Sequence, residues 1–141
     1  MSGPYFAYGA NLDRDAMRRR APGSRFAGRA AVEGWRFVID SSGWASIVSE
    51  AGARVEGALW LLTPEDERSL DGFEGVADGL YRRIEVDVSL EGGGVRRAWA
   101  YAATAGGTGR PGRDYLEQIV RAARSLGFSD RYLSELESWL S

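Results

Sequence analysis

A glutamate at position 74 lies in the stretch of the sequence whose residue types best suit proton-transfer chemistry. The stretch runs from Leu70 to Tyr81 and contains three glycines, which allow a close backbone approach and positive φ angles. Phe73 and Val76 place apolar groups near the Glu74 carboxylate, and desolvation raises the pKa of a carboxylate toward the range of a general base. The alternative interpretation is a glycine-rich surface turn with a solvated glutamate, and these residues alone leave both interpretations open.

The amino-acid composition narrows the chemistry that an enzyme of this sequence can use. Among 141 residues there is no histidine and no cysteine, and all 18 basic residues are arginines. This composition excludes disulfides, thiolate zinc sites, cysteine nucleophiles and imidazole-based triads, and the absence of lysine excludes Schiff-base chemistry. Proton transfers therefore fall to aspartate, glutamate, tyrosine, a substrate group or water.

The beginning of the chain holds a second candidate site. A short aromatic-rich strand is predicted from Pro4 to Tyr8, and Asp13 is a suitable N-cap for a helix that ends near Arg20. The segment from Gly9 to Leu12 predicts either a cradle of free backbone N–H groups for an anion or an ordinary strand-to-helix connection. The three arginines that end this helix are interpreted as solvated cations that compensate the helix dipole.

Apolar and alternating runs predict the remaining strands. These span Arg25 to Val32, Trp35 to Ile39, Ala45 to Ser49, Val55 to Leu62, an alternating segment from Tyr81 through Val88, and Val95 to Ala102. Gly57 inside one of them predicts a bulge or close packing. Glu85 and Asp87 are expected to pair with the arginines at positions 82, 83, 96 and 97 around the last hairpin.

Helical patterns complete a plan of one α+β domain over residues 1–141. A short inserted helix is predicted to begin with Thr63 as its N-cap and to end at the stretch that contains Glu74, where Asp71 and Asp78 are interpreted as turn-forming residues. Two C-terminal helices, predicted on either side of Gly127, are expected to pack outside mostly antiparallel strands.

The bulk charge and hydropathy indicate a protein without a polyanionic or membrane partner. The formal net charge is −2, no apolar run approaches the length of a membrane span, and the N-terminus lacks the pattern of a signal peptide. We therefore expect a cytoplasmic protein that binds neither nucleic acid nor membrane, as a monomer or homodimer. The five tryptophans are assigned mainly to the core, and an exposed one would indicate a dimer face.

The segments from Tyr5 to Leu12 and from Leu70 to Tyr81 together carry a family resemblance. The first resembles the N-terminal Tyr-Gly-Ser-Asn signature of the gamma-glutamylcyclotransferase family, which includes the butirosin-maturation cyclotransferases, and the second resembles the signature that holds the family's catalytic glutamate. Both occur in the family's order and at about its spacing, and the resemblance extends into the helix near Tyr115. It implies a small, mostly antiparallel β-barrel with peripheral helices.

The same resemblance implies an activity and a set of site residues. The activity is cyclisation of a gamma-glutamyl group with release of 5-oxoproline and a free amine, and Glu74 corresponds to the general acid/base. The loop at residues 8–12 corresponds to the one whose backbone holds the glutamyl group, chiefly its α-carboxylate. Ala10 replaces the family's serine, which either costs little or leaves the activity weak or redirected. The implied substrate-binding residues are Tyr8, Gly9, Ala10, Asn11, Leu12, Tyr81, Tyr101 and Tyr115.

The residue types agree with this chemistry, because the substrate's own amine is the nucleophile and one carboxyl group can act first as base and then as acid. The reaction needs no metal, cofactor or protein nucleophile. Two alternatives keep the same cavity: a tailoring enzyme that removes a gamma-glutamyl protecting group from a biosynthetic amine, and a non-catalytic binding module. Selection of the leaving group is expected to fall to loops such as Ala105–Gly112. Each tyrosine has an alternative role as a core aromatic with a satisfied hydroxyl.

Overall fold

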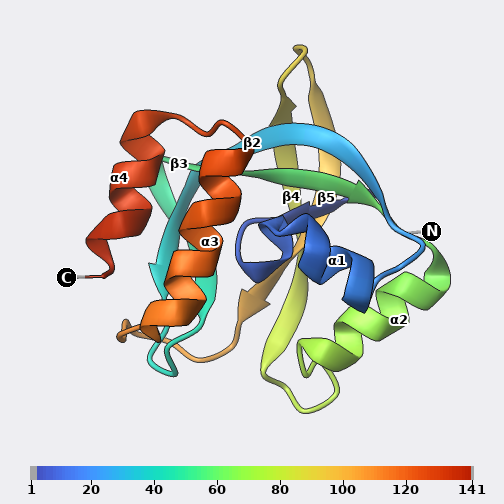
Figure 1. Cartoon of the computed structure of the whole chain (residues 1–141), viewed down its shortest axis with the longest axis horizontal. Helices are drawn as coiled ribbons and strands as arrows, with labels where there is room; N and C mark the ends of the chain where they lie inside the picture. Colours follow the sequence, from blue (N-terminus) through green and yellow to red (C-terminus); the bar gives the residue numbers. More distant parts are fainter. Residues whose placement is uncertain (1–2, 141) are drawn as a thin grey trace.

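Five strands close into a barrel in the computed structural model of the chain, which describes residues 3–140 (Figure 1). The strand order is β1-β3-β2-β4-β5, and every neighbouring pair is antiparallel except β1 and β5. The strands are β1 (Tyr5–Ala7), β2 (Arg25–Ile39), β3 (Ala45–Leu61), β4 (Tyr81–Leu90) and β5 (Val95–Ala103). The predicted fold class, an α+β barrel with mostly antiparallel strands, is confirmed.

Strands β2 and β3 are longer than the sequence pattern predicts. The four short strands expected between residues 25 and 62 are two continuous strands of 15 and 17 residues. The register between them shifts at Phe26/Gly28 and at Glu33/Trp35, where Gly28 and Gly34 adopt φ angles of 112° and 82°. These bulges interrupt the alternation of side chains without ending the strand, and they add the bend that closes a small barrel.

Gly57 permits a close contact between β1 and β3 in the barrel wall. A Cβ atom at this position would lie 2.4 Å from the carbonyl oxygen of Ala7 and 2.5 Å from the ring of Phe6. The expectation of close packing at Gly57 is therefore correct, and the irregularities lie elsewhere: Ala27 is the extra residue in β2, and residues 50–53 of β3 lie opposite Gly34. This contact brings β1 tightly against β3 and so fixes the position of the loop that follows β1.

Within residues 3–140, four α-helices and one 3₁₀ turn surround the barrel. They are η1 (Ala10–Leu12), α1 (Arg14–Arg20), α2 (Pro64–Phe73), α3 (Arg113–Ser125) and α4 (Asp130–Ser138). In Figure 1, α3 and α4 lie side by side along one flank of the barrel, and α2 lies at the other end. Thr63 and Asp66 form a capping box that begins α2 where the sequence predicts it. No helix within residues 3–140 is long and apolar enough to cross a membrane.

Candidate active site

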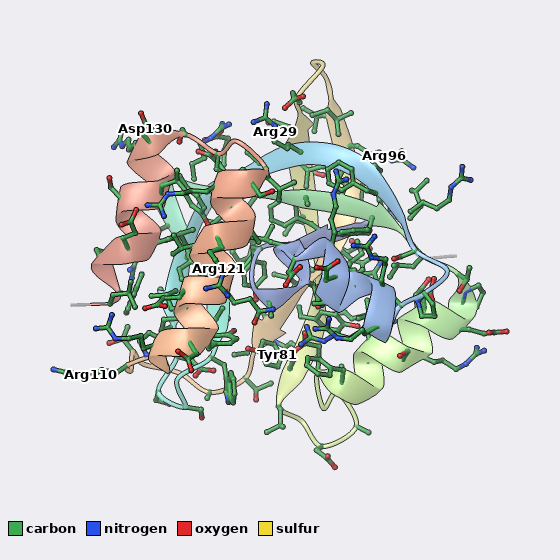
Figure 2. All side chains as sticks on the ribbon, viewed as in Figure 1. Arg29, Tyr81, Arg96, Arg110, Arg121 and Asp130 are labelled. Carbon is green, nitrogen blue, oxygen red and sulfur yellow. The ribbon has the colours of Figure 1, made fainter. Side chains whose placement is uncertain are left out.

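One pocket of about 510 Å³ gathers the two motifs of the sequence. Its wall comes from the loop after β1, the β2–β3 turn, the end of α2, the beginning of β4, the end of β5 and the first turns of α3. In Figure 1 the β2–β3 turn, the loop after α2 and the loop before α3 all lie at the lower edge of the molecule, and Figure 2 labels Tyr81 near the same edge. The predicted site residues that line the pocket are Tyr8, Gly9, Ala10, Asn11, Glu74, Tyr81, Tyr101 and Tyr115.

Leu12 is the exception among the predicted site residues. Its side chain is fully buried and belongs to the hydrophobic core, and it does not line the pocket. The loop folds into the η1 turn, in which the N–H groups of Leu12 and Asp13 donate to the carbonyls of Gly9 and Ala10. Leu12 therefore fixes the loop against the core, because its side chain faces away from the cavity.

Glu74 occupies the C-cap of α2, and its position is set by a Schellman motif. The N–H of Gly75 donates to the carbonyl of Gly72 at 3.2 Å, and the N–H of Val76 donates to the carbonyl of Asp71 at 3.0 Å. Gly75 adopts a φ angle of 66°, which is open to glycine at little cost. Gly75 therefore ends the helix directly after Glu74, and the Glu74 side chain lines the pocket.

The Glu74 side chain is half-buried, and within residues 3–140 it accepts no hydrogen bond from another protein group. Burial raises the pKa of this carboxyl from its ordinary value of 4.5 to about 7, against the opposing effect of the Arg20 charge. The negative end of the α2 dipole acts in the same direction as burial. A carboxyl group with a pKa near 7 exchanges protons readily at neutral pH, as a general acid/base must.

Arg20 is a pocket residue, contrary to its interpretation as a solvated cation. Its Nη1 atom donates to Asn11 Oδ1 at 2.6 Å, and its guanidinium stacks on the ring of Phe73 with Cζ at 3.8 Å from the ring centre. It is the only positively charged residue among the described residues that line the pocket. The sequence does hold a signal for this: Arg20 lies three and four residues after the buried Met17 and Ala16, on the inward face of the helix.

The hydroxyls of the pocket tyrosines are held by the protein in different ways. Tyr8 donates to the carbonyl of Tyr101 at 2.6 Å, and Tyr81 donates to the carbonyl of Ala45 at 2.6 Å. The Tyr115 hydroxyl instead accepts from the N–H of Ala45 at 3.0 Å. Burial raises the pKa of all three hydroxyls, and that of Tyr115 reaches about 12, so each is a neutral donor at physiological pH. These tyrosines therefore have both of the predicted roles: their rings pack against the hydrophobic core, and they also line the pocket.

Asp71 lies in helix α2, not in a turn, and it holds the hydroxyl of the pocket residue Tyr101. It lies in the last turn of α2, where Oδ1 accepts from the Tyr101 hydroxyl at 2.7 Å and from Arg83 Nε at 3.0 Å, and Oδ2 accepts from Arg83 Nη2 at 2.9 Å. Arg83 also donates to Glu67 at 2.8 Å and stacks over Trp99. This arginine was expected to pair within the hairpin; it instead ties α2 to β4 and β5. The expected pairing inside the hairpin occurs at Arg97, with partners at positions 85 and 87.

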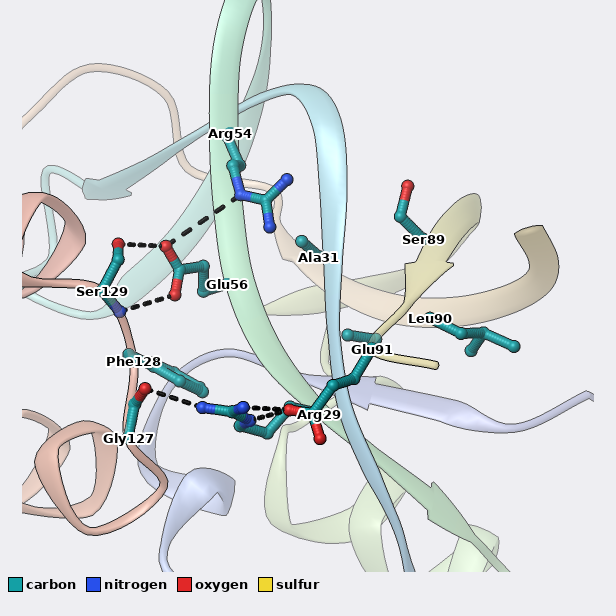
Figure 3. A pocket seen from close by; sticks show the side chains of 11 residues that line it. Arg29, Ala31, Arg54, Glu56, Ser89, Leu90, Glu91, Gly127, Phe128 and Ser129 are labelled. Carbon is teal, nitrogen blue, oxygen red and sulfur yellow. Dashed lines mark hydrogen bonds and ion pairs between the residues drawn. The ribbon is translucent and has the colours of Figure 1, made fainter. Parts of the chain in front are cut away.

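A second hollow, of about 400 Å³, lies near Arg29, and its charged groups are engaged with one another (Figure 3). Arg29 pairs with Glu91 and donates to the carbonyl of Gly127 at 2.7 Å, just beyond the end of α3. Glu56 accepts from the N–H of Ser129 at 3.0 Å, at the beginning of α4. These contacts satisfy helix ends, which is a structural role. No cluster of three or more aspartate or glutamate residues that could hold a metal ion occurs within residues 3–140.

Comparisons with known proteins identify a family and several similar proteins. A model of the AIG2-like family matches residues 54–136, more than half of the chain. Gamma-glutamylcyclotransferase of Homo sapiens is 28% identical over 144 residues, covering 95% of this chain and 77% of that protein, and the Bos taurus protein of the same name is 29% identical with the same coverage. A solved structure named gamma-glutamyl cyclotransferase superposes with a TM-score of 0.90 at 28% identity, over 98% of this chain and 88% of that chain.

Proposed function

The chain belongs to the AIG2-like family, and from this membership and the geometry of its pocket we propose that it cyclises gamma-glutamyl amides, releasing 5-oxoproline and a free amine. The resemblance to the gamma-glutamylcyclotransferase family is confirmed by the matching family model and by the relatives that carry that name. The observation that carries the proposal is the half-buried Glu74 carboxyl, with a pKa of about 7, in the pocket that also holds the loop at residues 8–12.

We propose that the loop and Arg20 together bind the glutamyl part of the substrate. The first N–H groups of a helical turn have no partner inside the turn, so those of Ala10 and Asn11 are suited to the α-carboxylate. Arg20 lies beside this loop through its bond to Asn11 and supplies the positive charge that a carboxylate requires. Glu74, in the same pocket, is the counterpart for the α-ammonium group.

The proposed reaction begins when the Glu74 carboxylate accepts a proton from the substrate's α-ammonium group. The resulting amine attacks the γ-carbonyl carbon and closes a five-membered ring. Protonated Glu74 then donates to the departing nitrogen as the amide C–N bond breaks. The ring nitrogen, still protonated after the attack, passes its second proton through Glu74 to the released amine. Across one turnover the α-nitrogen thus loses two protons and the leaving nitrogen gains two, and Glu74 returns to its starting state. Holding amine and carbonyl in contact supplies the proximity term that makes this intramolecular attack fast.

Two tyrosine hydroxyls in the pocket, those of Tyr5 and Tyr115, can donate a hydrogen bond to the substrate. Those of Tyr8, Tyr81 and Tyr101 donate to protein oxygens. The hydroxyl of Tyr115 accepts from the backbone at Ala45, and that of Tyr5 accepts from the Asn11 side chain, so their protons face no acceptor among the described residues. We propose that these donors, with backbone N–H groups of the loop, stabilise the oxygen of the γ-carbonyl as it becomes negative.

The proposal is tested by incubating the purified protein with gamma-glutamyl amino acids, gamma-glutamylamines and glutathione. Three products are quantified in each reaction: 5-oxoproline, glutamate and the free amine. Cyclisation predicts 5-oxoproline and amine in equal amounts, without glutamate. Glutamate in place of 5-oxoproline would indicate hydrolysis by water and would contradict the mechanism. Absence of any product across the panel would favour a non-catalytic binding module.

A further inference from the structure

The opening of the pocket that holds Glu74 is lined by exposed apolar side chains. Six large apolar side chains are well exposed within residues 3–140, and three of them line this one pocket. These three, here called the apolar rim, are Trp44, Phe73 and Leu80, with exposed fractions of 51%, 56% and 61%. Single exposed apolar residues are ordinary on a protein surface, but a group of them around one opening indicates a binding surface.

Each residue of the apolar rim directly precedes a residue whose polar groups belong to the inner pocket. Trp44 precedes Ala45, whose N–H and carbonyl hold the hydroxyls of two tyrosines. Phe73 precedes Glu74, and Leu80 precedes Tyr81. The same three segments therefore supply polar groups to the inside of the pocket and apolar side chains to its opening, so polarity decreases from the inside outward.

The rim side chains are held in place by neighbouring groups. The Trp44 ring packs edge to face on Tyr115, with ring centres 5.1 Å apart. The Phe73 ring lies under the Arg20 guanidinium. Leu80 packs against Gly75, where an added Cβ atom would lie 2.7 Å from Leu80 Cδ1. A surface that is already ordered loses little conformational freedom when a ligand covers it, which favours binding.

We propose that the apolar rim binds the leaving group, and that the preferred substrates are gamma-glutamyl conjugates of bulky aliphatic or aromatic amines or amino acids. This inference rests on the proposed function, because the reacting glutamyl group must lie inside, against Glu74, and the rest of the substrate must then extend to the mouth. The pocket volume of about 510 Å³ lies within the range of about 300–1,000 Å³ typical of small-molecule sites, so there is room for such a group.

The test compares kcat/KM for gamma-glutamylleucine and gamma-glutamylphenylalanine with that for gamma-glutamylglycine, measured as 5-oxoproline release. Filling an apolar pocket with added methylene groups is worth about 10-fold or more, so we expect at least that ratio in favour of the bulky leaving groups. Leu80→Ser and, separately, Phe73→Ser are expected to reduce this ratio several-fold. Val95→Ser is the matched control, because Val95 is 72% exposed and lies at the β4–β5 hairpin, at the other end of β5 from the pocket; it should leave the ratio unchanged.

The outcomes separate the inference from the function beneath it. Equal kcat/KM for the glycine and leucine conjugates, or a ratio that neither rim variant changes, would overturn the role of the apolar rim while leaving the cyclotransferase assignment intact. No 5-oxoproline from any conjugate would refute the proposed function, and the inference would fail with it. A preference for conjugates of charged or hydroxylated amines would also overturn the inference.

Discussion

Replacing Asp71 with asparagine tests whether this residue, in the last turn of α2, positions Tyr101 in the pocket wall. The change keeps the shape of the side chain but removes its charge and one of its two acceptor oxygens. The native carboxylate accepts three hydrogen bonds, two from Arg83 and one from the Tyr101 hydroxyl. An asparagine in the same place keeps its oxygen for at most two of them and turns a donor toward the third.

The structure sets the size of the expected effect. The side chains of Arg83 and Asp71 are 28% and 33% exposed, between the exposed pairs that contribute about 0–1 kcal/mol and the buried ones whose disruption costs about 3–5 kcal/mol. We expect the free energy of unfolding to fall by about 2 kcal/mol. Arg83 keeps its bond to Glu67 at 2.8 Å, which limits the loss. We also expect kcat/KM to fall about 10-fold, a loss of about 1.4 kcal/mol, because Tyr101 loses a charged acceptor in the pocket wall.

The assay combines denaturant unfolding with steady-state kinetics on Asp71→Asn, Tyr101→Phe and the double variant. The two side chains are in direct contact, so the double-mutant cycle should show a coupling of about 1 kcal/mol. Asp87→Asn is the matched control, because Asp87 pairs with Arg97 at the surface, where the two side chains are 62% and 61% exposed. If Asp71→Asn costs no more than Asp87→Asn, or the cycle is additive, Asp71 does not position Tyr101.

Three further predictions follow from single positions. The pKa of Glu74 is raised from 4.5 to about 7 in the folded protein, so the folded state holds its proton more tightly than the unfolded state does. The wild-type protein should therefore lose at most about 3 kcal/mol of stability as pH rises through this window, and Glu74→Gln should lose less. Equal pH dependence of the two proteins in urea unfolding would contradict this. Gly57→Ala should destabilise by about 1–3 kcal/mol, whereas Gly72→Ala, with open space at its Cβ, should not. Arg20→Gln should raise KM about 10-fold or more, through loss of a charge-assisted bond to the substrate carboxylate, and the exposed Arg18→Gln should not; equal KM values would refute that role.

Much of the fold follows from local patterns in the sequence. The alternation of Ile84, Val86 and Val88 predicts β4, and the Thr63 cap predicts the beginning of α2. The continuity of β2 and β3 could not be predicted in this way, because the register shift at Gly34 and the exposed residues 50–52 opposite it break the two-residue period that identifies a strand. A local pattern reports where side chains point, and it does not report whether a strand continues past a bulge.

The candidate site divides along the same physical line. Glu74, Tyr8 and Tyr81 lie in two motifs that are contiguous in sequence, and the family resemblance adds Tyr101 and Tyr115. The structure brings all five to one cavity. The roles of Asp71 and Trp44 could not be assigned in this way, because they depend on contacts between distant segments: Asp71 with Tyr101 and Arg83, and Trp44 with Tyr115. The inward helical face indicates that Arg20 is partly buried, but its partners Asn11 and Phe73 follow only from the structure. Such contacts form only when the barrel closes, and the sequence of a single segment does not predict them.

The central claim is that the Glu74 carboxyl transfers the proton in the cyclisation. The most direct measurement pairs the affinity of Glu74→Gln for a gamma-glutamyl amide, by calorimetry, with its rate of 5-oxoproline release from the same compound. We expect binding within about threefold of the wild-type value and a rate reduced by at least about 100-fold, because glutamine keeps the shape of the side chain and cannot exchange the proton. A variant that still releases 5-oxoproline at a rate near that of the wild type would contradict the claim.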